Sequence, residues 1–283
     1  MPERITLAID GGIASAVALE WALARASTTA VDVRLTTIDE SGVSVMDSLK
    51  QLQAAQALGR AAARFAAVAP LAQVEMVMLR GDAVDRLARE SMSADLIVIG
   101  SHPVGMLAGL FSATLPLAIA ARSACPVVVV PVGWRSSTGP VVVGVDEPTS
   151  ERAQEFAATE AERLGRELVM VRAWELPPAV TPHLLGVGTV DEAIHDANAE
   201  LLSSAASSVA SRHGALPLRE KLSYATPSIA LAGGAQKMEL VVVGTHHRRG
   251  LAEWVHGSVG HELVMHLPCP IAIVPPASLP AVA

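Results

Sequence analysis

The fold of this chain is decided by LIVIGSHPVGMLAGLFSATLPLAIAARSACPVVVVP (Leu96–Pro131), which matches LVVVGTHHRRGLAEWVHGSVGHELVMHLPCPIAIVP (Leu240–Pro275) without a gap. Gly100 falls on Gly244, and Cys125 falls on Cys269. Upstream, ITLAID at residues 5–10 falls on VVVGVD at residues 141–146. The chain is therefore a tandem repeat of one unit of about 140 residues.

The repeat predicts two domains, residues 1–134 and residues 139–283, joined near GWRSSTGP at residues 133–140. Ser, Gly and Pro of this segment mark a linker between a closing strand and an opening strand. Expected strands occupy residues 5–10, 31–39, 74–79, 96–100 and 126–131 of the first unit, and 141–146, 167–174, 219–224, 239–244 and 271–275 of the second. Expected helices occupy residues 14–26, 46–68, 83–93, 110–122 and 191–213.

The predicted strands are near-continuous runs of Val, Ile and Leu, which is typical of parallel strands covered by helices on both faces. We therefore predict an α/β fold made of two tandem, five-stranded, parallel α/β sandwich domains of the doubly wound type. The commonest order of such strands places strand one beside strand four, where the winding reverses and a ligand crevice opens. An acid (Asp10 or Asp146) and a glycine (Gly100 or Gly244) then face one site in each unit.

The loop after Gly244 has the chemistry of a phosphate site. Gly244 presents no side chain, and Gly257 with Ser258 lies where the next helix should begin. Free backbone N–H groups at a helix start attract phosphate oxygens, and the neighbouring Arg248 and Arg249 add fork-shaped donors. Asp146 could accept from a base amine or a ribose hydroxyl. The alternative is a surface turn with solvated arginines and structural glycines.

These residues resemble the universal stress proteins in their tandem, two-domain form, whose fold is of the adenine-nucleotide α-hydrolase-like type. ATP-binding members carry a glycine, a second glycine after two residues, and a glycine with Ser or Thr after nine more. Here Gly244, His247 and Gly257 with Ser258 occupy those positions, so His247 replaces the middle glycine. The first unit departs further, because Pro103 stands at the middle position and proline has no N–H to offer phosphate.

The resemblance implies an adenine-nucleotide site, with ATP as ligand and with or without Mg²⁺. In the second unit its residues would be Asp146, Ala173, Val243, Gly244, His246, His247, Arg248, Gly250, Gly257, Ser258 and Val259. A weakened site in the first unit would use Asp10, Gly11, Thr37, Gly100, His102, Gly105, Ala113 and Thr114. The resemblance also implies pairing of the two fifth strands about a pseudo-twofold axis, between the halves of one chain or in a homodimer.

Several classes of function are not expected. A net charge of −7 argues against nucleic-acid binding, and the apolar runs are too short to span a membrane. The start MPERITLAID lacks a signal-peptide pattern, which favours the cytoplasm. His261 and His266 are five residues apart and do not share a helical face, so no metal site is expected.

No phosphate-loop lysine motif or nucleophile elbow occurs in the sequence, so we do not expect an enzyme. Gly186–Asp191 (GVGTVD) lacks a third glycine and a preceding strand, and we interpret it as a flexible lead into the next helix. Two readings of function remain: an ATP-dependent regulator in the stress response, or an interaction module of the same fold that binds no nucleotide.

Overall fold

The computed structural model describes residues 1–40, 45–101, 114–146, 151–175, 187–245, 259–266 and 268–276. The first half contains β1 (Glu3–Ala8), α1 (Ile13–Ala26), β2 (Val31–Asp39), α2 (Val45–Val68), β3 (Gln73–Arg80), α3 (Ala83–Glu90), β4 (Leu96–Ser101), α4 (Thr114–Arg122) and β5 (Val127–Pro131). The second half contains β6 (Val141–Gly144), α5 (Glu151–Leu164), β7 (Leu168–Trp174), α6 (Val187–Arg212), β8 (Leu218–Tyr224), α7 (Pro227–Ala232), a 3-10 helix (Ala235–Lys237), β9 (Leu240–Gly244), α9 (Val259–His266) and β10 (Ile271–Val274).

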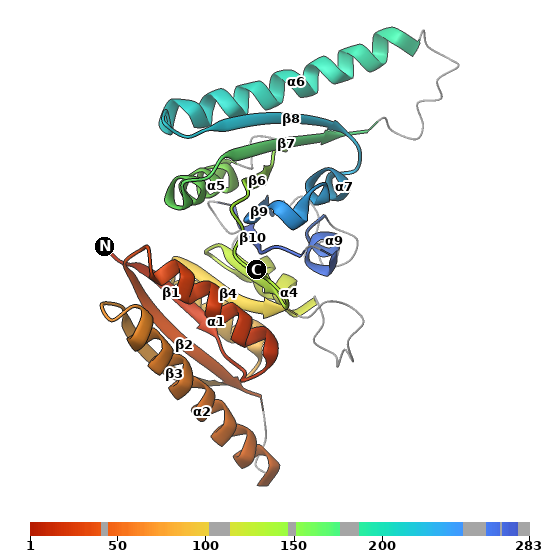
Figure 1. Ribbon diagram of the computed structural model, residues 1–283. Helices are drawn as coiled ribbons and strands as arrows, with labels where there is room; N and C mark the ends of the chain where they lie inside the picture. Colours follow the sequence, from red (N-terminus) through yellow and green to blue (C-terminus); the bar gives the residue numbers. More distant parts are fainter. Residues whose placement is uncertain are drawn as a thin grey trace.

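All the strands join in one ten-stranded sheet with the order β3-β2-β1-β4-β5-β10-β9-β6-β7-β8 (Figure 1). The strands within each half are parallel, and β1 lies beside β4 as β6 lies beside β9. This confirms the α/β fold of two five-stranded units and places a winding reversal in each.

The two halves meet through their fifth strands, β5 and β10, which are the only antiparallel neighbours in the described sheet. Val128 lies opposite Ala272 at the middle of this short ladder. Antiparallel pairing of equivalent strands is what a pseudo-twofold axis through the sheet requires. The predicted pairing of the fifth strands therefore occurs within one chain.

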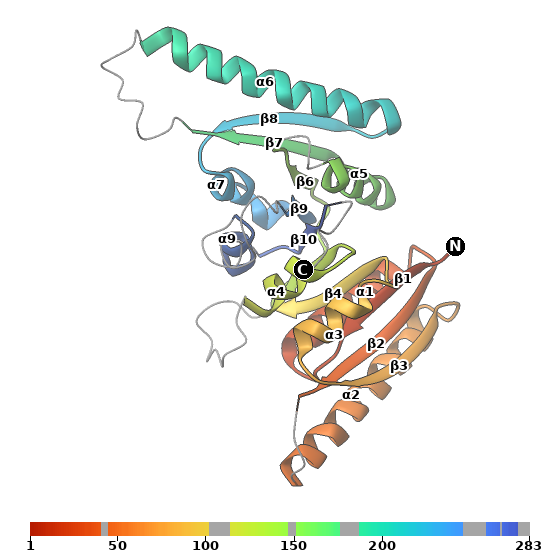
Figure 2. The same cartoon turned by 180° about the vertical axis from the view of Figure 1, so that it is seen from behind.

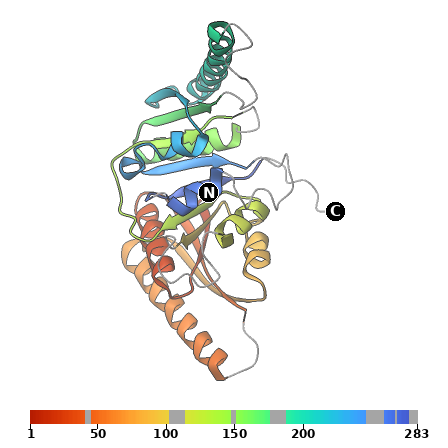
Figure 3. The same ribbon diagram turned by 90° about the vertical axis from the view of Figure 1, so that its right-hand side faces the viewer.

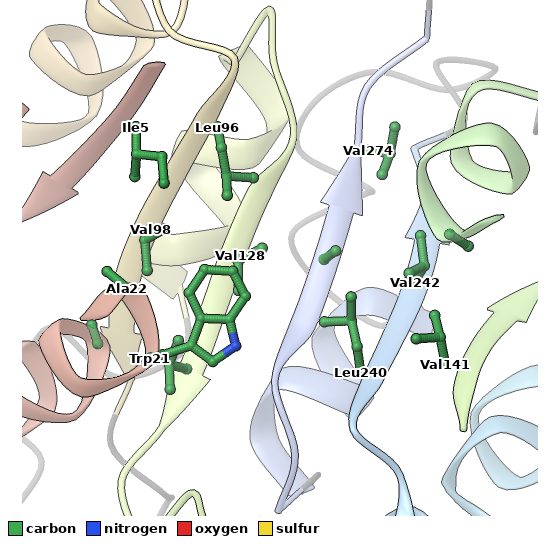
Figure 4. Packing of buried hydrophobic residues seen from close by; sticks show 14 of the residues in the cluster. Ile5, Trp21, Ala22, Leu96, Val98, Val128, Val141, Leu240, Val242 and Val274 are labelled. Carbon is green, nitrogen blue, oxygen red and sulfur yellow. The ribbon is translucent and has the colours of Figure 1, made fainter. Parts of the chain in front are cut away.

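Helices cover both faces of the sheet (Figures 1 and 2). Residues of α1, α2, α5 and α6 share one buried hydrophobic cluster, and residues of α3, α4, α7 and α9 share the other. Figure 3 shows α2 and α6 at opposite ends of the molecule, over the outer strands of each half. Figure 4 shows Val98, Val128, Val242 and Val274 on one face of the sheet near the junction, so the first cluster is continuous across the two halves.

Burial follows position in the sheet. The central strands β4, β5, β9 and β10 are almost entirely buried, as the apolar runs predicted. The outer strand β3 is different, because Met76 and Met78 are 56% and 41% exposed. The expectation that helices cover every strand on both faces is therefore wrong for β3. This strand is at the edge of the sheet, where it has one strand neighbour, and its Met76 and Met78 side chains are left partly uncovered.

Helix boundaries agree with the sequence within a few residues, with one exception. Helix α6 begins at Val187, so most of the segment interpreted as a flexible lead is its first turn. The expected helix at residues 110–122 is described from Thr114 onward.

Cys125 and Cys269 are buried, unpaired thiols, and desolvation raises the pKa of each to about 12. No helix in the described ranges is both long and apolar enough to cross a bilayer.

Candidate functional site

The crevice of the second domain lies beyond the carboxyl ends of β6, β7 and β9. Strand β6 is hydrogen-bonded to β7 on one side and to β9 on the other. Asp146 follows the end of β6 by two residues, Ala173 lies near the end of β7, and Val243 with Gly244 ends β9. The topology therefore brings these four predicted site residues to one edge of the sheet, as the strand order requires.

The Asp146 carboxylate is held by Arg172, a basic residue near the end of the otherwise apolar strand β7. Arg172 Nη1 donates to Asp146 Oδ1 at 2.6 Å and to the Val145 carbonyl oxygen at 3.2 Å. Its Nε donates to Asn198 Oδ1 of α6 at 2.9 Å. The Arg172 side chain is 16% exposed and the Asp146 side chain 56% exposed. Asp146 is thus fixed in orientation while still facing solvent.

Sequence reasoning missed Arg172 because it concentrated on glycines and acids after strands. A signal was present, since an arginine in LVMVRAW is costly unless a partner neutralises it. The arginine points to the face of α6, where Asn198 is itself oriented by a bond from Nδ2 to the Ile194 carbonyl oxygen at 2.7 Å. Strand β7, which carries Arg172, and helix α6, which carries Asn198, therefore together position the guanidinium group that holds Asp146.

Ala173 and Val243 lie on the opposite face of the sheet from Arg172. Both pack in the cluster that includes α7 and α9, and Val243 is 6% exposed. Helix α9 begins at Val259, so its free N–H groups lie directly after the predicted Gly-Ser pair. Six predicted site residues lie outside the described part of the chain: His246, His247, Arg248, Gly250, Gly257 and Ser258.

Thr245, which follows Gly244, is a further polar group at this edge. Its N–H donates to the Val274 carbonyl oxygen at 2.9 Å, and the residue is 5% exposed. Its Oγ1 is buried and has no hydrogen-bond partner among the described residues. A buried hydroxyl without a partner is unusual, and a ligand oxygen at the start of the loop would satisfy it. The described residues here fit a phosphate-bearing ligand.

The first domain uses its glycine at the same position for packing. A Cβ at Gly100 would lie 2.0 Å from the carbonyl oxygen of Ala14, in the first turn of α1. The backbone of α1 therefore occupies the space that a ligand would need directly above Gly100. Asp10 turns back on its own loop, because Gly12 N–H donates to its Oδ1 at 2.8 Å, and Gly11 has a φ of 81°.

The site residues predicted for the two domains do not occupy equivalent positions on the second strand of each domain, β2 and β7. Ala8 pairs with Thr36, whereas the corresponding Gly144 pairs with Val171. Thr37 therefore corresponds to Arg172, not to Ala173. Successive side chains of a strand point to opposite faces, so Thr37 and Ala173 cannot serve the same subsite. His102, Gly105 and Ala113 lie outside the described residues, and Thr114 is the first residue of α4.

No group of three or more metal-ligating side chains is found in the described ranges. His261 and His266 both lie in α9, where His266 Nδ1 is 2.9 Å from the Glu262 carbonyl oxygen.

The fold defines a class of protein, the tandem doubly wound α/β proteins with a winding reversal in each half. The chain belongs to the universal stress protein family, whose model matches residues 1–131 and 138–275. It is 30% identical over 216 residues to universal stress protein Rv1996 of Mycobacterium tuberculosis, covering 75% of this chain and 68% of the relative.

The solved structures that are similar to this chain include two universal stress proteins. A universal stress protein from Archaeoglobus fulgidus covers 96% of both chains with a TM-score of 0.71 and 14% identity, which shows the tandem fold. A universal stress protein in complex with cAMP is 26% identical and covers 50% of this chain and 99% of its own, with a TM-score of 0.38.

Proposed function

We propose that this chain binds one adenine nucleotide, ATP, in its second domain and acts in the cytoplasm as a nucleotide-dependent regulator of the stress response. Family membership and the partly kept glycine loop support the ligand class. The observation that carries the proposal is the Asp146–Arg172 pair, which holds an exposed carboxylate at the switch-point edge of the second domain. The first domain lacks an equivalent pair, since Thr37 stands where Arg172 would be.

Asp146 would accept a hydrogen bond from the base or the ribose, and the start of α9 would take phosphate oxygens. ATP carries a negative charge that the helix N-terminus stabilises, and Mg²⁺ would add charge compensation when bound with it. We propose binding and release of the nucleotide rather than turnover.

A second candidate is an interaction module that binds no nucleotide. The packing role of Gly100 favours this reading for the first domain. Because β5 and β10 already pair with each other, a homodimer would need a surface other than the fifth strands. The two readings differ in nucleotide occupancy.

The test is to denature the purified protein, chromatograph what it releases, and titrate the emptied protein with ATP and Mg²⁺ by calorimetry. One equivalent per chain is the expected result. Gly257→Leu should abolish binding with an unchanged melting temperature, because a branched side chain would fill the phosphate position. No binding by the folded wild-type protein would favour the interaction module, and full binding by Gly257→Leu would remove the second-domain loop from the site.

A further variant separates base recognition from phosphate recognition. Asp146→Ala should weaken ATP more than inorganic triphosphate, because only the nucleotide offers a base and a ribose. Asp196→Ala is the matched control, since Asp196 is an 80% exposed aspartate of α6. Equal weakening of both ligands would exclude Asp146 from recognition of the base or ribose.

A further inference from the structure

Helix α2 and strand β3 form the outer end of the first domain (Figure 1), and this end is unusually apolar. Eleven large hydrophobic side chains of the described residues are exposed, and six of them lie on α2, on β3 and in the turn between these two elements. The six are Leu49, Leu52, Val68, Leu71, Met76 and Met78. Exposed apolar side chains that gather on one surface mark an interaction site more often than chance.

Strand β8, at the other edge of the sheet, carries charged residues where β3 is apolar. By strand register Glu220 corresponds to Met76, and Lys221 corresponds to Val77. Charged side chains, lysine above all, discourage an edge strand from pairing with another chain. Strand β3 lacks this protection, because residues 76–79 are MVML.

The helices that lie over these two edge strands differ in the same way. The turns that follow α2 and α6 carry equivalent hydrogen bonds, from Ala69 N–H in the first domain and from His213 N–H in the second. By this alignment the exposed Leu52 and Val68 of α2 correspond to Asp196 and Arg212 of α6. The fold therefore tolerates charge at these positions, so packing does not explain the apolar residues of the first domain.

Strand β3 also presents unpaired backbone groups beside these side chains. At its end Gly81 N–H donates to the Asp39 carbonyl oxygen of β2 at 3.1 Å. The direction of the backbone groups alternates along a strand, so the N–H and carbonyl groups of Met76 and Met78 point away from β2. On that side β3 has no strand neighbour in the described sheet.

Two charges near this edge are not balanced by the described part of the chain. Arg34 Nε lies 3.2 Å from Glu90 and 3.6 Å from Glu75, so one guanidinium serves two carboxylates, and Glu75 is 64% exposed. In α3, Arg86 donates to the Arg80 carbonyl oxygen and makes no ion pair with a described residue. A partner for this edge should therefore bring a cation to Glu75 and an anion to Arg86, and a second copy of the chain brings both.

We propose that β3 pairs with β3 of a second copy of this chain, antiparallel about a twofold axis at Val77. Met76 of each copy then lies opposite Met78 of the other, with their outward backbone groups hydrogen-bonded, and the two ten-stranded sheets become one. The internal β5–β10 junction already pairs equivalent strands in this way. Pairing of β3 with itself closes after two copies, whereas pairing of β3 with the charged β8 would continue as a filament.

The same register matches the unbalanced charges. Glu75 lies opposite Leu79 of the second copy, two residues before Gly81 of that copy. Arg86 Nε covers Gly81, since it lies 3.2 Å from the position of a Cβ built there. The Glu75 carboxylate of each copy therefore comes next to the Arg86 guanidinium of the other, on the face of the sheet that α3 covers.

The first test is sedimentation velocity of the full chain over a concentration series, in which we expect a reversible equilibrium between monomer and dimer. Met76→Glu introduces the residue of β8 and should raise the dissociation constant about a hundredfold, because twofold symmetry buries two new charges. Ile229→Glu is the matched control, since Ile229 is a 66% exposed apolar residue on α7 of the second domain. It should dimerise like the wild type, and melting temperatures establish that both variants are folded.

A cysteine at the twofold axis tests the register. The Cα atoms of a non-hydrogen-bonded antiparallel pair are about 4.5 Å apart, a separation that allows a disulfide. Oxidised glutathione should therefore cross-link Val77→Cys into a dimer and leave Gln73→Cys a monomer on a denaturing gel, because residue 73 lies far from the axis. The two native cysteines are buried and serve as an internal control in the wild type.

Charge reversal tests the contact between Glu75 and Arg86. Glu75→Arg should weaken dimerisation severalfold, and adding Arg86→Glu in the same chain should restore the wild-type dissociation constant. Several results would overturn the proposal: a monomer at submillimolar concentration, open polymers in place of a dimer, or equal losses in Met76→Glu and Ile229→Glu. Equal cross-linking of Gln73→Cys and Val77→Cys, or no restoration by the second charge reversal, would also contradict it.

Discussion

The guanidinium of Arg25 in the first domain is bound through its two terminal nitrogens by the carboxylate of Glu160 in the second. Nη1 donates to Oε2 and Nη2 to Oε1, each at 2.7 Å, and the two side chains are 4% and 2% exposed. Burial alone would raise the pKa of Glu160, but its hydrogen bonds to Arg25 outweigh this and lower the pKa. The pair stays ionised and fixes α1 against α5.

Glu160→Gln should destabilise the chain by about 3 kcal/mol, because it leaves a buried guanidinium without one of its carboxylates. Glu3 still pairs with Arg25, through Nε at 2.6 Å, which limits the loss. Urea denaturation measures the free energy of unfolding. The control is Glu20→Gln, which breaks an equally two-pronged but half-exposed pair with Arg64 and should cost less than about 1 kcal/mol. Equal losses of unfolding free energy in the two variants would show that burial of the Arg25–Glu160 pair does not increase its contribution to stability.

The sequence predicted the parts of the fold that depend on periodicity and repetition. Apolar runs located the strands, and the alignment of Cys125 with Cys269 located the two fifth strands that pair at the junction. The Arg25–Glu160 pair was not predictable in this way, because the two residues come from different domains and meet only after both have folded.

The candidate site was predicted less completely, for a similar reason. Asp146 and Gly244 could be predicted to lie near each other because strand order alone brings the ends of β6 and β9 together. Arg172 was missed because its role depends on a side-chain contact with Asp146 that no spacing reveals. Gly100 was interpreted as a ligand glycine, yet its contact with Ala14 gives it a packing reason that only the helix position shows.

Gly100→Ala tests that packing reason. The new Cβ would lie 2.0 Å from the Ala14 carbonyl oxygen, so α1 must shift, and we expect a loss of about 2–3 kcal/mol of unfolding free energy. Gly59→Ala is the matched control, because nothing lies within 4 Å of its Cβ in α2 and alanine favours the helix by about 0.5–1 kcal/mol. Chemical denaturation of both variants measures the difference. Equal stability of the two would show that α1 is not in close contact with β4.

His213 should make stability depend on pH. Burial lowers the pKa of His213, but the hydrogen bonds that its ring N–H groups donate to Glu162 and Glu155, each 3.0 Å away, outweigh burial and raise the pKa above its usual value. A raised pKa in the folded state means that the contribution is complete below the unfolded value and is lost as pH rises through the folded value. The wild type should therefore lose stability relative to His213→Gln as the pH rises above about 6.5, the usual pKa of histidine, with both proteins followed by urea denaturation. Parallel profiles for the two proteins would contradict this role.

Arg172→Met should weaken ATP binding about tenfold without unfolding the chain. The methionine keeps the packing of β7 but removes the 2.6 Å charge-assisted bond that orients Asp146, and such a bond contributes about 1.5–3 kcal/mol. Arg219→Met is the control. Arg219 lies on the neighbouring strand β8 and pairs with Glu167, away from Asp146. Calorimetric titration of both variants with ATP gives the comparison. If Arg172 acts only by orienting Asp146, the double variant Arg172→Met, Asp146→Ala should bind ATP as weakly as Asp146→Ala alone. Once the Asp146 carboxylate has been removed, Arg172 has nothing left to orient. Additive losses in the double variant would instead mean that Arg172 contacts the nucleotide independently.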